Sequence, residues 1–526
     1  MARFSFNSVL LNMFIVLIFI LSFRAFAGFL APDFDADQAV HVMMAYDLQL
    51  PEDLYYWGQS RLGSLLPIVS HWLLKISPLS PLEVVSYVQY GFLAISFFCF
   101  IRLFRKPITK VVFALICFLP PQPFLKLVEV AHPYAPQFAL LGIALVSADQ
   151  LITSPESNTI KKNVLSFVAL VSLILSVWVS DLSLVPKGLA AILVVLTFLQ
   201  RYRKSNKQNR FVGETLAHQS QDATLKLLRT SSIVICTFVT LLLGSAFLVY
   251  AKSTASQQDE NYGILAINGL DVIADIVRSI LVAVSHTFLF QVGNPFLSLY
   301  AIAVLGLVFV LAYYWFQARH TPVFTNRTYW IPFFLGSAIG SFFLILLSRW
   351  TLIQSTPPRY FIGVYIFLWL SALIVFDNLR SPELIRKNAL RRVTTLLVLT
   401  ALLGSLSLPE YVFALEKPQS RFSMLQPIAT LGQAGFIGEY WASYLMCIVA
   451  PEQTSCTPHD QSFFRCGRCV QAVLASPIIY LVERDWLESF PEEIEQFGQR
   501  LEKQGKVKKI AGYWMAPYRN MTVSKN

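Results

Sequence analysis

The chain has 526 residues, of which 55% are hydrophobic and only 14% are charged. Soluble domains carry about 25% charged residues, so this composition excludes an ordinary soluble protein and indicates an integral membrane protein. The formal net charge is +11. Its basic residues lie mainly in alternate loops between apolar stretches, which indicates orientation in a membrane and not binding to nucleic acid.

Apolar stretches of the length needed to cross a bilayer recur along the chain. They predict about eleven membrane-spanning helices, at 9–30, 82–101, 111–125, 135–152, 163–180, 183–200, 231–251, 295–316, 329–348, 360–377 and 393–412. Two further apolar stretches, 62–76 and 264–290, are interrupted by charged residues. We expect these two to be amphipathic helices on the membrane face. The sequence therefore predicts an all-α polytopic domain over residues 1–412.

Charged residues predict the orientation of this domain. Lys and Arg gather in every second loop, including 102–110, 201–210 and 386–392, whereas the first long loop, 31–81, is acidic. The positive-inside rule then places the N-terminus in the cytoplasm and the C-terminal tail outside. A bacterial inner (plasma) membrane is the expected location. Ala25 and Ala27 imitate a signal-peptide cleavage site, but the preceding apolar run is long for a signal core.

The tail, residues 413–526, is predicted to be a small extracytoplasmic α/β or α+β domain. Apolar 477–482 favours a strand, and Glu-rich 491–509 favours an amphipathic helix. Four cysteines suggest disulfides, for which three pairings exist: Cys447, Cys456, Cys466 and Cys469. A zinc site is the alternative, because two of these cysteines have C-x-x-C spacing and His459 is near.

Asp33, Asp35 and Asp37 follow directly after the first apolar stretch. A carboxylate at the water edge of a bilayer is costly to retain and is suited to act as a base or to bind a cation. We take Asp37 as the candidate catalytic base and Asp35 as the second choice. Asp33 and Asp35 could instead hold a divalent cation such as Mg²⁺ or Mn²⁺. The structural alternative is a helix start with Asp37 at the N-cap.

Other polar residues near predicted span ends are candidates for binding substrate. An Arg beside a Tyr at the lipid–water edge suits a carrier phosphate, which favours Arg359 with Tyr360 over Arg349. The alternative for this pair is an interfacial anchor. The full candidate set for substrate binding is His41, Tyr56, Gln59, Arg61, Glu129, His132, Arg349, Arg359 and Tyr360.

The order of motifs in the first 80 residues resembles the first extracytoplasmic loop of GT-C membrane glycosyltransferases. DQAVHVMMA begins at Asp37 and YWGQSRLGS begins at Tyr56. More narrowly, the chain looks like the bacterial branch related to protein O-mannosyltransferases, in which DEA-x-x-x-x-MA precedes YGQ-x-x-GS. Gln38 replaces the usual Glu, and Trp57 interrupts the second motif.

The resemblance implies a GT-C fold and a transferase that moves a hexose or pentose from a polyprenyl-phosphate carrier to an acceptor. The acceptor is a glycan, a lipid or a protein on the extracytoplasmic face. A carboxylate would take the proton of the acceptor hydroxyl, and cations would stabilise the leaving phosphate. A secondary transporter or a lipid or sugar flippase is the main alternative, and a non-enzymatic assembly protein is another.

Overall fold

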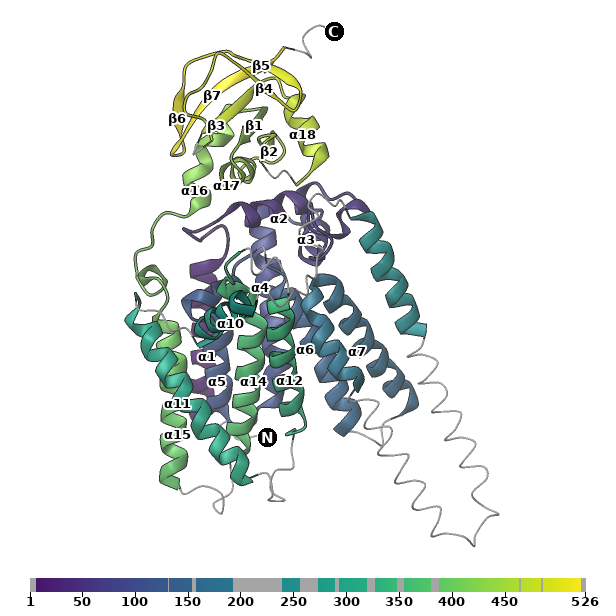
Figure 1. The fold of residues 1–526 in the computed structure, drawn as a ribbon, viewed down its shortest axis with the longest axis vertical. Coiled ribbons are helices and arrows are strands. Elements are labelled where there is room, and N and C mark those ends of the chain that lie inside the picture. The colour runs from purple at the N-terminus through teal and green to yellow at the C-terminus, as the bar shows by residue number, and fades with distance from the viewer. Residues whose placement is uncertain are drawn as a thin grey trace, which may run out of the picture.

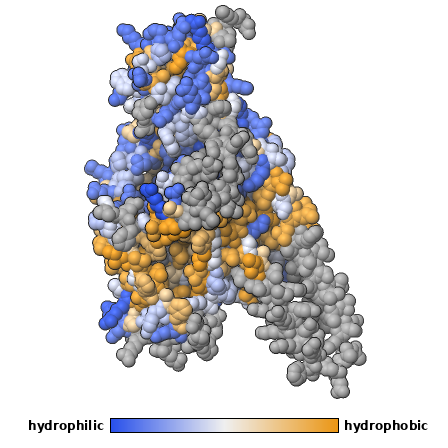
Figure 2. Space-filling model, in the orientation of Figure 1, coloured by the Kyte–Doolittle hydropathy of each residue, from blue (hydrophilic) through white to orange (hydrophobic). Residues whose placement is uncertain are grey.

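The computed structural model describes residues 6–130, 132–153, 158–192, 239–255, 273–288, 293–318, 327–347, 354–379, 387–462, 465–483 and 486–521. Figure 1 shows a bundle of long helices with a small sheet domain at one end. The first loop lies between the bundle and this domain. Figure 2 shows hydrophobic residues gathered over the bundle and hydrophilic residues over the sheet domain, which is the surface pattern of a multi-pass membrane protein.

Within the described residues, eight helices are long and apolar enough to cross a membrane. Six of these helices match predicted spans closely: α1 (Phe6–Phe26), α4 (Pro81–Phe100), α6 (Tyr134–Thr153), α7 (Thr159–Val179), α11 (Pro295–Ala318) and α12 (Trp330–Leu347). The other two are α14 (Ile362–Asn378) and α15 (Lys387–Leu406), the second of which starts earlier than predicted. Hydrophobic composition therefore predicted these spans correctly.

The predicted span 111–125 is wrong. This part of the chain forms α5 (Pro107–Phe118), which has only 12 residues, and then the 3₁₀ helix η3 (Gln122–Leu127). Pro120 and Pro121 separate the two, because proline cannot continue a helix from the preceding residues. The predicted spans 183–200 and 231–251 lie partly outside the described residues. Of the predicted surface helices, 62–76 contains α3 (Leu65–Leu74), and 264–290 contains α10 (Ile273–Phe288).

The first loop is folded and not extended. It contains α2 (Ala36–Tyr46), the short η1 (Glu52–Leu54) and α3, and it leads into α4 through a capping box formed by Ser80 and Glu83. Nine of the eleven residues of α2 are buried. A surface helix that is buried on nearly every side must be covered by another part of the chain. The C-terminal domain provides that cover.

The C-terminal domain contains a mixed sheet with strand order β2-β1-β3-β7-β5-β4, and β6 also pairs with β7. Its strands are β1 (Ala434–Gly438), β2 (Thr454–Pro458), β3 (Ile479–Glu483), β4 (Glu493–Gln496), β5 (Gln499–Lys503), β6 (Lys508–Ile510) and β7 (Tyr513–Asn520). Its helices include α16 (Arg421–Leu425), α17 (Tyr440–Ser443) and α18 (Gly467–Leu474). The predicted strand at 477–482 is confirmed by β3, whereas the helix predicted over 491–509 is wrong.

One hydrophobic core joins the first loop to the C-terminal domain. It contains Val40 and Met44 of α2, together with Phe436, Tyr444 and Met446. Two disulfides lie in the same region and pair neighbours in sequence, Cys447–Cys456 and Cys466–Cys469. The first loop and the C-terminal domain therefore form one packed unit at the end of the bundle (Figure 1).

Candidate functional site

Asp35 is the N-cap of α2, and its side chain accepts a hydrogen bond from the backbone N–H of Gln38 at 3.0 Å. The sequence alternative that placed Asp37 at the cap is therefore wrong. Asp37 lies in the first turn of the helix instead. Because the cap occupies one oxygen of Asp35, the Asp37 carboxylate is the less constrained of the two.

The second oxygen of Asp35 binds Lys126, which joins two acidic residues. The Lys126 ammonium lies 2.8 Å from Asp35 and 2.7 Å from Glu129. Gln38 donates to the same Glu129 carboxylate at 3.2 Å. We call these four residues the Lys126 cluster. Together with Asp33 they line a cavity of about 240 Å³.

Burial and charge oppose each other in the Lys126 cluster. Burial raises the pKa of Glu129 above its ordinary value, and Lys126 only partly offsets this effect. Burial alone would lower the pKa of Lys126, but Glu129 and Asp35 together raise it. Lys126 therefore stays charged at neutral pH and holds the two carboxyl groups in place.

Asp37 is bound by residues of the C-terminal domain. The Tyr440 hydroxyl donates to the Asp37 carboxylate at 2.6 Å, and the Arg465 guanidinium lies 3.9 Å from the same oxygen. Arg465 also donates to the Tyr440 oxygen at 3.2 Å, and its guanidinium lies over the Tyr56 ring. We call Asp37, Tyr56, Tyr440 and Arg465 the Asp37 cluster. The Asp37 side chain remains 23% exposed, so a substrate can still reach it.

The two tyrosines of this cluster act as neutral groups. Burial is the main reason that the pKa values of Tyr56 and Tyr440 lie well above the ordinary value, and the Asp37 charge adds to the effect. Tyr440 thus keeps its proton and donates it in the hydrogen bond to Asp37. Tyr56 donates to the backbone oxygen of the same residue at 3.3 Å.

A second arginine from the C-terminal domain fixes the first loop. Arg468 binds Asp53 through two nitrogens, at 2.6 and 3.2 Å, and its Nε lies 3.2 Å from Asp47. Only 3% of the Asp53 side chain is exposed, and Trp57 donates to it at 2.8 Å. Buried, two-pronged ion pairs of this kind fix geometry. Arg465 directly precedes Cys466, and Arg468 lies in the first turn of α18 between the two disulfide-bonded cysteines, so the start of α18 supplies both arginines.

The predicted donor residues lie directly before the N-terminal end of α14. Arg359 and Tyr360 belong to the 3₁₀ helix η7 (Pro358–Phe361), which leads into α14. The Tyr134 hydroxyl donates to the backbone oxygen of Arg359. The Arg359 guanidinium is close enough to Asp37 for their charges to interact. The two predicted site residues are therefore within reach of each other's charge, without a direct ion pair between them.

His132 and His41 lie near the same cations. Burial first, and then the charges of Lys126 and Arg359, lower the pKa of His132 well below its ordinary value, so this imidazole is neutral at pH 7. The His41 ring lies 4.9 Å from the Tyr56 ring. Both histidines therefore line the region between the Lys126 cluster and the Asp37 cluster.

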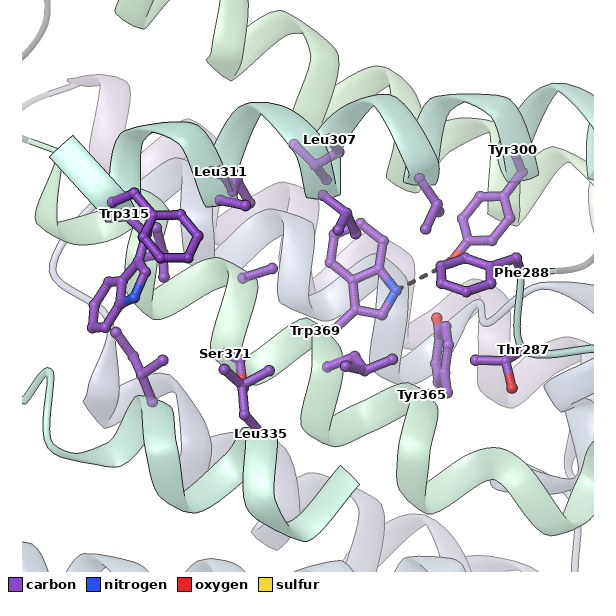
Figure 3. Close-up of a pocket in the computed structure, with 18 residues that line it drawn as sticks. Thr287, Phe288, Tyr300, Leu307, Leu311, Trp315, Leu335, Tyr365, Trp369 and Ser371 are labelled. Carbon is purple, nitrogen blue, oxygen red and sulfur yellow. Dashed lines mark hydrogen bonds between the residues drawn. The ribbon is translucent and has the colours of Figure 1, made fainter. Parts of the chain in front are cut away.

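An apolar pocket of about 400 Å³ lies among α10, α11, α12 and α14, and its first lining residue on α14 is Tyr365, six residues after Arg359. Figure 3 shows Tyr300, Leu307 and Leu311 on one wall and Tyr365 and Trp369 on another. The Trp369 indole donates to the Tyr300 hydroxyl at 3.1 Å (Figure 3). The pocket extends along α14 away from η7. A lipid chain could therefore occupy the pocket with its head group at η7.

The remaining predicted residues have separate positions. Gln59 accepts from Arg61 at 3.3 Å, and Asp33 accepts from Tyr411 at 3.3 Å. Arg349 lies outside the described residues. At Asp35, where the sequence suggested a divalent cation, the structure places the Lys126 ammonium against the carboxylate. The described part of the chain contains no group of three His, Cys, Asp or Glu side chains suited to hold a metal ion.

Sequence reasoning missed Lys126, Tyr440, Arg465 and Arg468. Lys126 has a local signal, because it lies three residues before Glu129 and the pair follows an apolar stretch. Tyr440 has none, since it is separated from Asp37 by 403 residues. Only the fold brings these two side chains together.

The fold as a whole is similar to that of a known transferase. The crystal structure of ArnT from Cupriavidus metallidurans in the apo state matches with a TM-score of 0.51 and 11% identity, covering 98% of each chain. ArnT is a GT-C glycosyltransferase. The resemblance seen in the first 80 residues is therefore confirmed at the level of the fold, which is GT-C.

Two other structures match less well. ArnT from the same organism bound to undecaprenyl phosphate has a TM-score of 0.49 with 10% identity, covering 97% of each chain. The Archaeoglobus fulgidus oligosaccharyltransferase in the apo form has a TM-score of 0.41 with 12% identity, covering 85% of this chain and 64% of that one. We draw no argument from either match. No protein-family model and no curated protein sequence matches the chain.

Proposed function

We propose that this chain, which has the GT-C fold, is a membrane glycosyltransferase that uses a polyprenyl-phosphate-linked sugar. It transfers the sugar to an acceptor hydroxyl on the extracytoplasmic face. One observation carries the proposal: the Asp37 carboxylate and the Arg359 guanidinium lie close enough for their charges to interact, and an apolar pocket suited to a lipid chain has its first α14 residue at Tyr365, six residues after Arg359. A base, a phosphate-binding cation and a lipid groove are the three parts that such a transfer requires.

The base and the phosphate-binding cation each have one role in the reaction. Asp37 takes the proton of the acceptor hydroxyl as the acceptor oxygen bonds to the anomeric carbon of the sugar. The bond from that carbon to the carrier phosphate oxygen breaks, and polyprenyl phosphate leaves with the electron pair. Arg359 stabilises the charge that develops on this phosphate. Tyr440 and Arg465 hold the Asp37 carboxylate in position for the proton transfer.

The pocket among α11, α12 and α14 supports a lipid carrier over a soluble donor. A free nucleotide sugar would have no use for an apolar cavity that runs down a membrane helix. Tyr365 and Trp369 lie one and two turns into α14, directly inward from Arg359. A carrier with its phosphate at Arg359 would therefore place its first prenyl units against these aromatic side chains.

The orientation remains a proposal and follows from the same arrangement. Described basic residues of the loops, including Arg105, Lys106 and Arg391, lie at helix ends opposite the C-terminal domain. The positive-inside rule places that end in the cytoplasm, with the C-terminal domain (proposed to begin at residue 413) outside. An impermeant thiol reagent applied to intact cells should label Arg519→Cys and should not label Arg391→Cys. The opposite labelling pattern would reject this topology.

The activity test uses the full chain in lipid nanodiscs with a panel of undecaprenyl-phosphate hexoses and pentoses. Release of undecaprenyl phosphate supports the transferase, whereas movement of the lipid across the bilayer without release supports a flippase. Arg359→Ala should weaken carrier binding by about 1.5–3 kcal/mol, the scale of a hydrogen bond to a charged group. Arg359→Lys should restore part of that loss, since it keeps the charge but not the planar fork.

Arg519→Ala is the matched control, because this arginine is exposed on β7 of the C-terminal domain. It should leave carrier binding unchanged. If Arg359→Ala binds the carrier as tightly as the unmodified chain, the proposed place of the phosphate is wrong. If the unmodified chain releases no undecaprenyl phosphate from any donor of the panel, the proposed activity itself is wrong.

A further inference from the structure

A groove of about 540 Å³ lies in the C-terminal domain, outside the two clusters described above. Its lining includes three aromatic residues, Phe490, Tyr513 and Trp514, and two charged residues, Arg421 and Glu483. Tyr513 and Trp514 are neighbours in β7 and point to opposite faces of the sheet, so the groove reaches both faces at this end of the sheet. This volume lies within the range of small-molecule sites, about 300–1,000 Å³. The transfer chemistry proposed above assigns this groove no role.

Trp514 is the main exposed aromatic side chain of the groove. Half of its surface (50%) is exposed, although it lies in a central strand of the sheet. Its partner across β3 is Glu483, and its partner across β6 is Lys509. Directly paired residues point to the same face of a sheet, so the indole lies between an acidic and a basic side chain. The Lys509 ammonium lies 5.7 Å from the centre of the indole ring.

The floor of the groove is built to hold this arrangement. β6 and β7 are joined by a two-residue turn, Ala511 and Gly512, both with positive φ. Turns of this type fix the register of a hairpin. This register fixes Trp514 opposite Lys509, and the separate pairing of β3 with β7 places Glu483 on the other side of Trp514.

Arg421 connects the groove to the Lys126 cluster. Its side chain lines both the groove and the cavity that contains Asp33, Asp35 and Lys126. Its guanidinium donates to the Tyr513 hydroxyl and lies over the Tyr513 ring. Its backbone N–H donates to Ala31 in the first loop at 3.0 Å. A ligand in the groove therefore lies against the same side chain that forms a wall of the acidic cavity.

From these observations we infer that the groove is a saccharide-binding site that holds the non-reacting part of a glycan acceptor. A sugar ring has an apolar C–H face, which packs on an indole, and a rim of hydroxyls, which bond to a carboxylate and a guanidinium. A lipid chain would require a larger apolar wall than this half-polar groove provides. The acceptor role rests on the proposed transferase function, whereas saccharide binding does not.

The test measures binding of an array of defined oligosaccharides to the full chain in nanodiscs, without any lipid-linked donor. Saturation-transfer NMR on the bound oligosaccharides then gives their affinity. At least one should bind, and Trp514→Ala and Glu483→Gln should each weaken it by about tenfold or more. Trp441→Ala is the matched control, since this tryptophan of α17 is 45% exposed but lies outside the groove. It should leave saccharide affinity unchanged.

Failure of this inference can be told apart from failure of the proposed function. No binding to the array by a chain that releases undecaprenyl phosphate overturns the saccharide site and leaves the transferase intact; the acceptor is then a protein or a lipid. Equal losses in Trp514→Ala and Trp441→Ala also overturn it, because they show non-specific stacking. Specific binding at Trp514 by a chain that does not turn over any donor supports the saccharide site and rejects its acceptor role.

Discussion

Asp35 and Asp37 are two residues apart, yet different parts of the molecule hold them. Asp35 is bound within the helical bundle and first loop, by the α2 backbone and by Lys126. Asp37 is bound from the C-terminal domain, by Tyr440 and Arg465. The first carboxylate is neutralised by a nearby ammonium, whereas the second is oriented mainly by a hydroxyl. Both side chains are partly exposed, Asp35 at 31% and Asp37 at 23%, so their partners distinguish them: a carboxylate neutralised by an ammonium suits a structural role, and one oriented by a hydroxyl suits proton transfer.

The largest expected effect separates the two carboxylates. Asp37→Asn keeps the size of the side chain and removes the base, so release of undecaprenyl phosphate should fall by roughly 10²–10⁴ while carrier binding survives. Asp35→Asn should chiefly lower stability, because it removes the ion pair with Lys126, whereas the Asn side chain can still cap α2. Turnover and thermal unfolding of both variants provide the measurement. Near-normal turnover in a well-folded Asp37→Asn chain would remove Asp37 from the mechanism.

Substitution of Lys126 should have the next largest effect, which is a loss of stability. Lys126→Met leaves Asp35 and Glu129 without their shared cation, which should lower the free energy of unfolding by about 1–3 kcal/mol. The expected loss of stability is smaller than for a fully buried ion pair, because the Lys126 side chain is 25% exposed. Lys126→Arg keeps the charge and is the control. Unchanged thermal unfolding of Lys126→Met would show that the cluster does not stabilise the first loop.

Tyr440 tests whether the C-terminal domain positions the base. Tyr440→Phe removes one hydrogen bond to a charged group, worth about 1.5–3 kcal/mol, so kcat should fall by at least about tenfold with little change in KM for the carrier. Tyr518→Phe is the control, since the Tyr518 hydroxyl donates to Pro491 at 2.7 Å within the same domain. Equal losses of kcat in both variants would indicate general damage to the domain and no positioning role for Tyr440.

His132 should give the smallest effect, and only in acid. Its pKa is lower in the folded chain than its ordinary value of 6.5. Its contribution to stability is therefore present above about pH 6.5 and is lost as the pH falls below that value. His132→Gln should reduce the drop in melting temperature between pH 7 and about pH 5. An identical drop in both chains would mean that other groups cause the acid destabilisation.

The long helices were predictable because a membrane span requires a continuous apolar stretch. The helix predicted over 491–509 shows where such reasoning fails. Ile494, Phe497 and Leu501 have helical spacing, but Phe497 and Gly498 both adopt positive φ and form the turn of a hairpin between β4 and β5. The spacing of these apolar residues fits both a helix and a hairpin. Pairing of β5 with β7, between residues fifteen to nineteen positions apart, decided between them.

The candidate site likewise contains residues that the local sequence predicts and residues that only the fold brings together. Residues close to the first apolar stretch could be proposed from the sequence, because carboxylates there are costly without a function. The structural alternative named the wrong aspartate as the helix cap, since either Asp35 or Asp37 could precede the first turn of α2. Tyr440 and Arg465 could not be proposed at all. Their role depends on the docking of the C-terminal domain, which no local pattern encodes.

The contact between Asp37 and Tyr440 spans 403 residues of the chain. A ribosome makes Asp37 at a point 403 residues before Tyr440, so the nascent chain lacks half of the Asp37 cluster throughout that stretch of synthesis. The cluster can close only after the segment that carries Tyr440 and Arg465 has folded against α2. Completion of the cluster is therefore a late step in the folding of this chain, and premature termination anywhere before residue 465 leaves the cluster without Arg465.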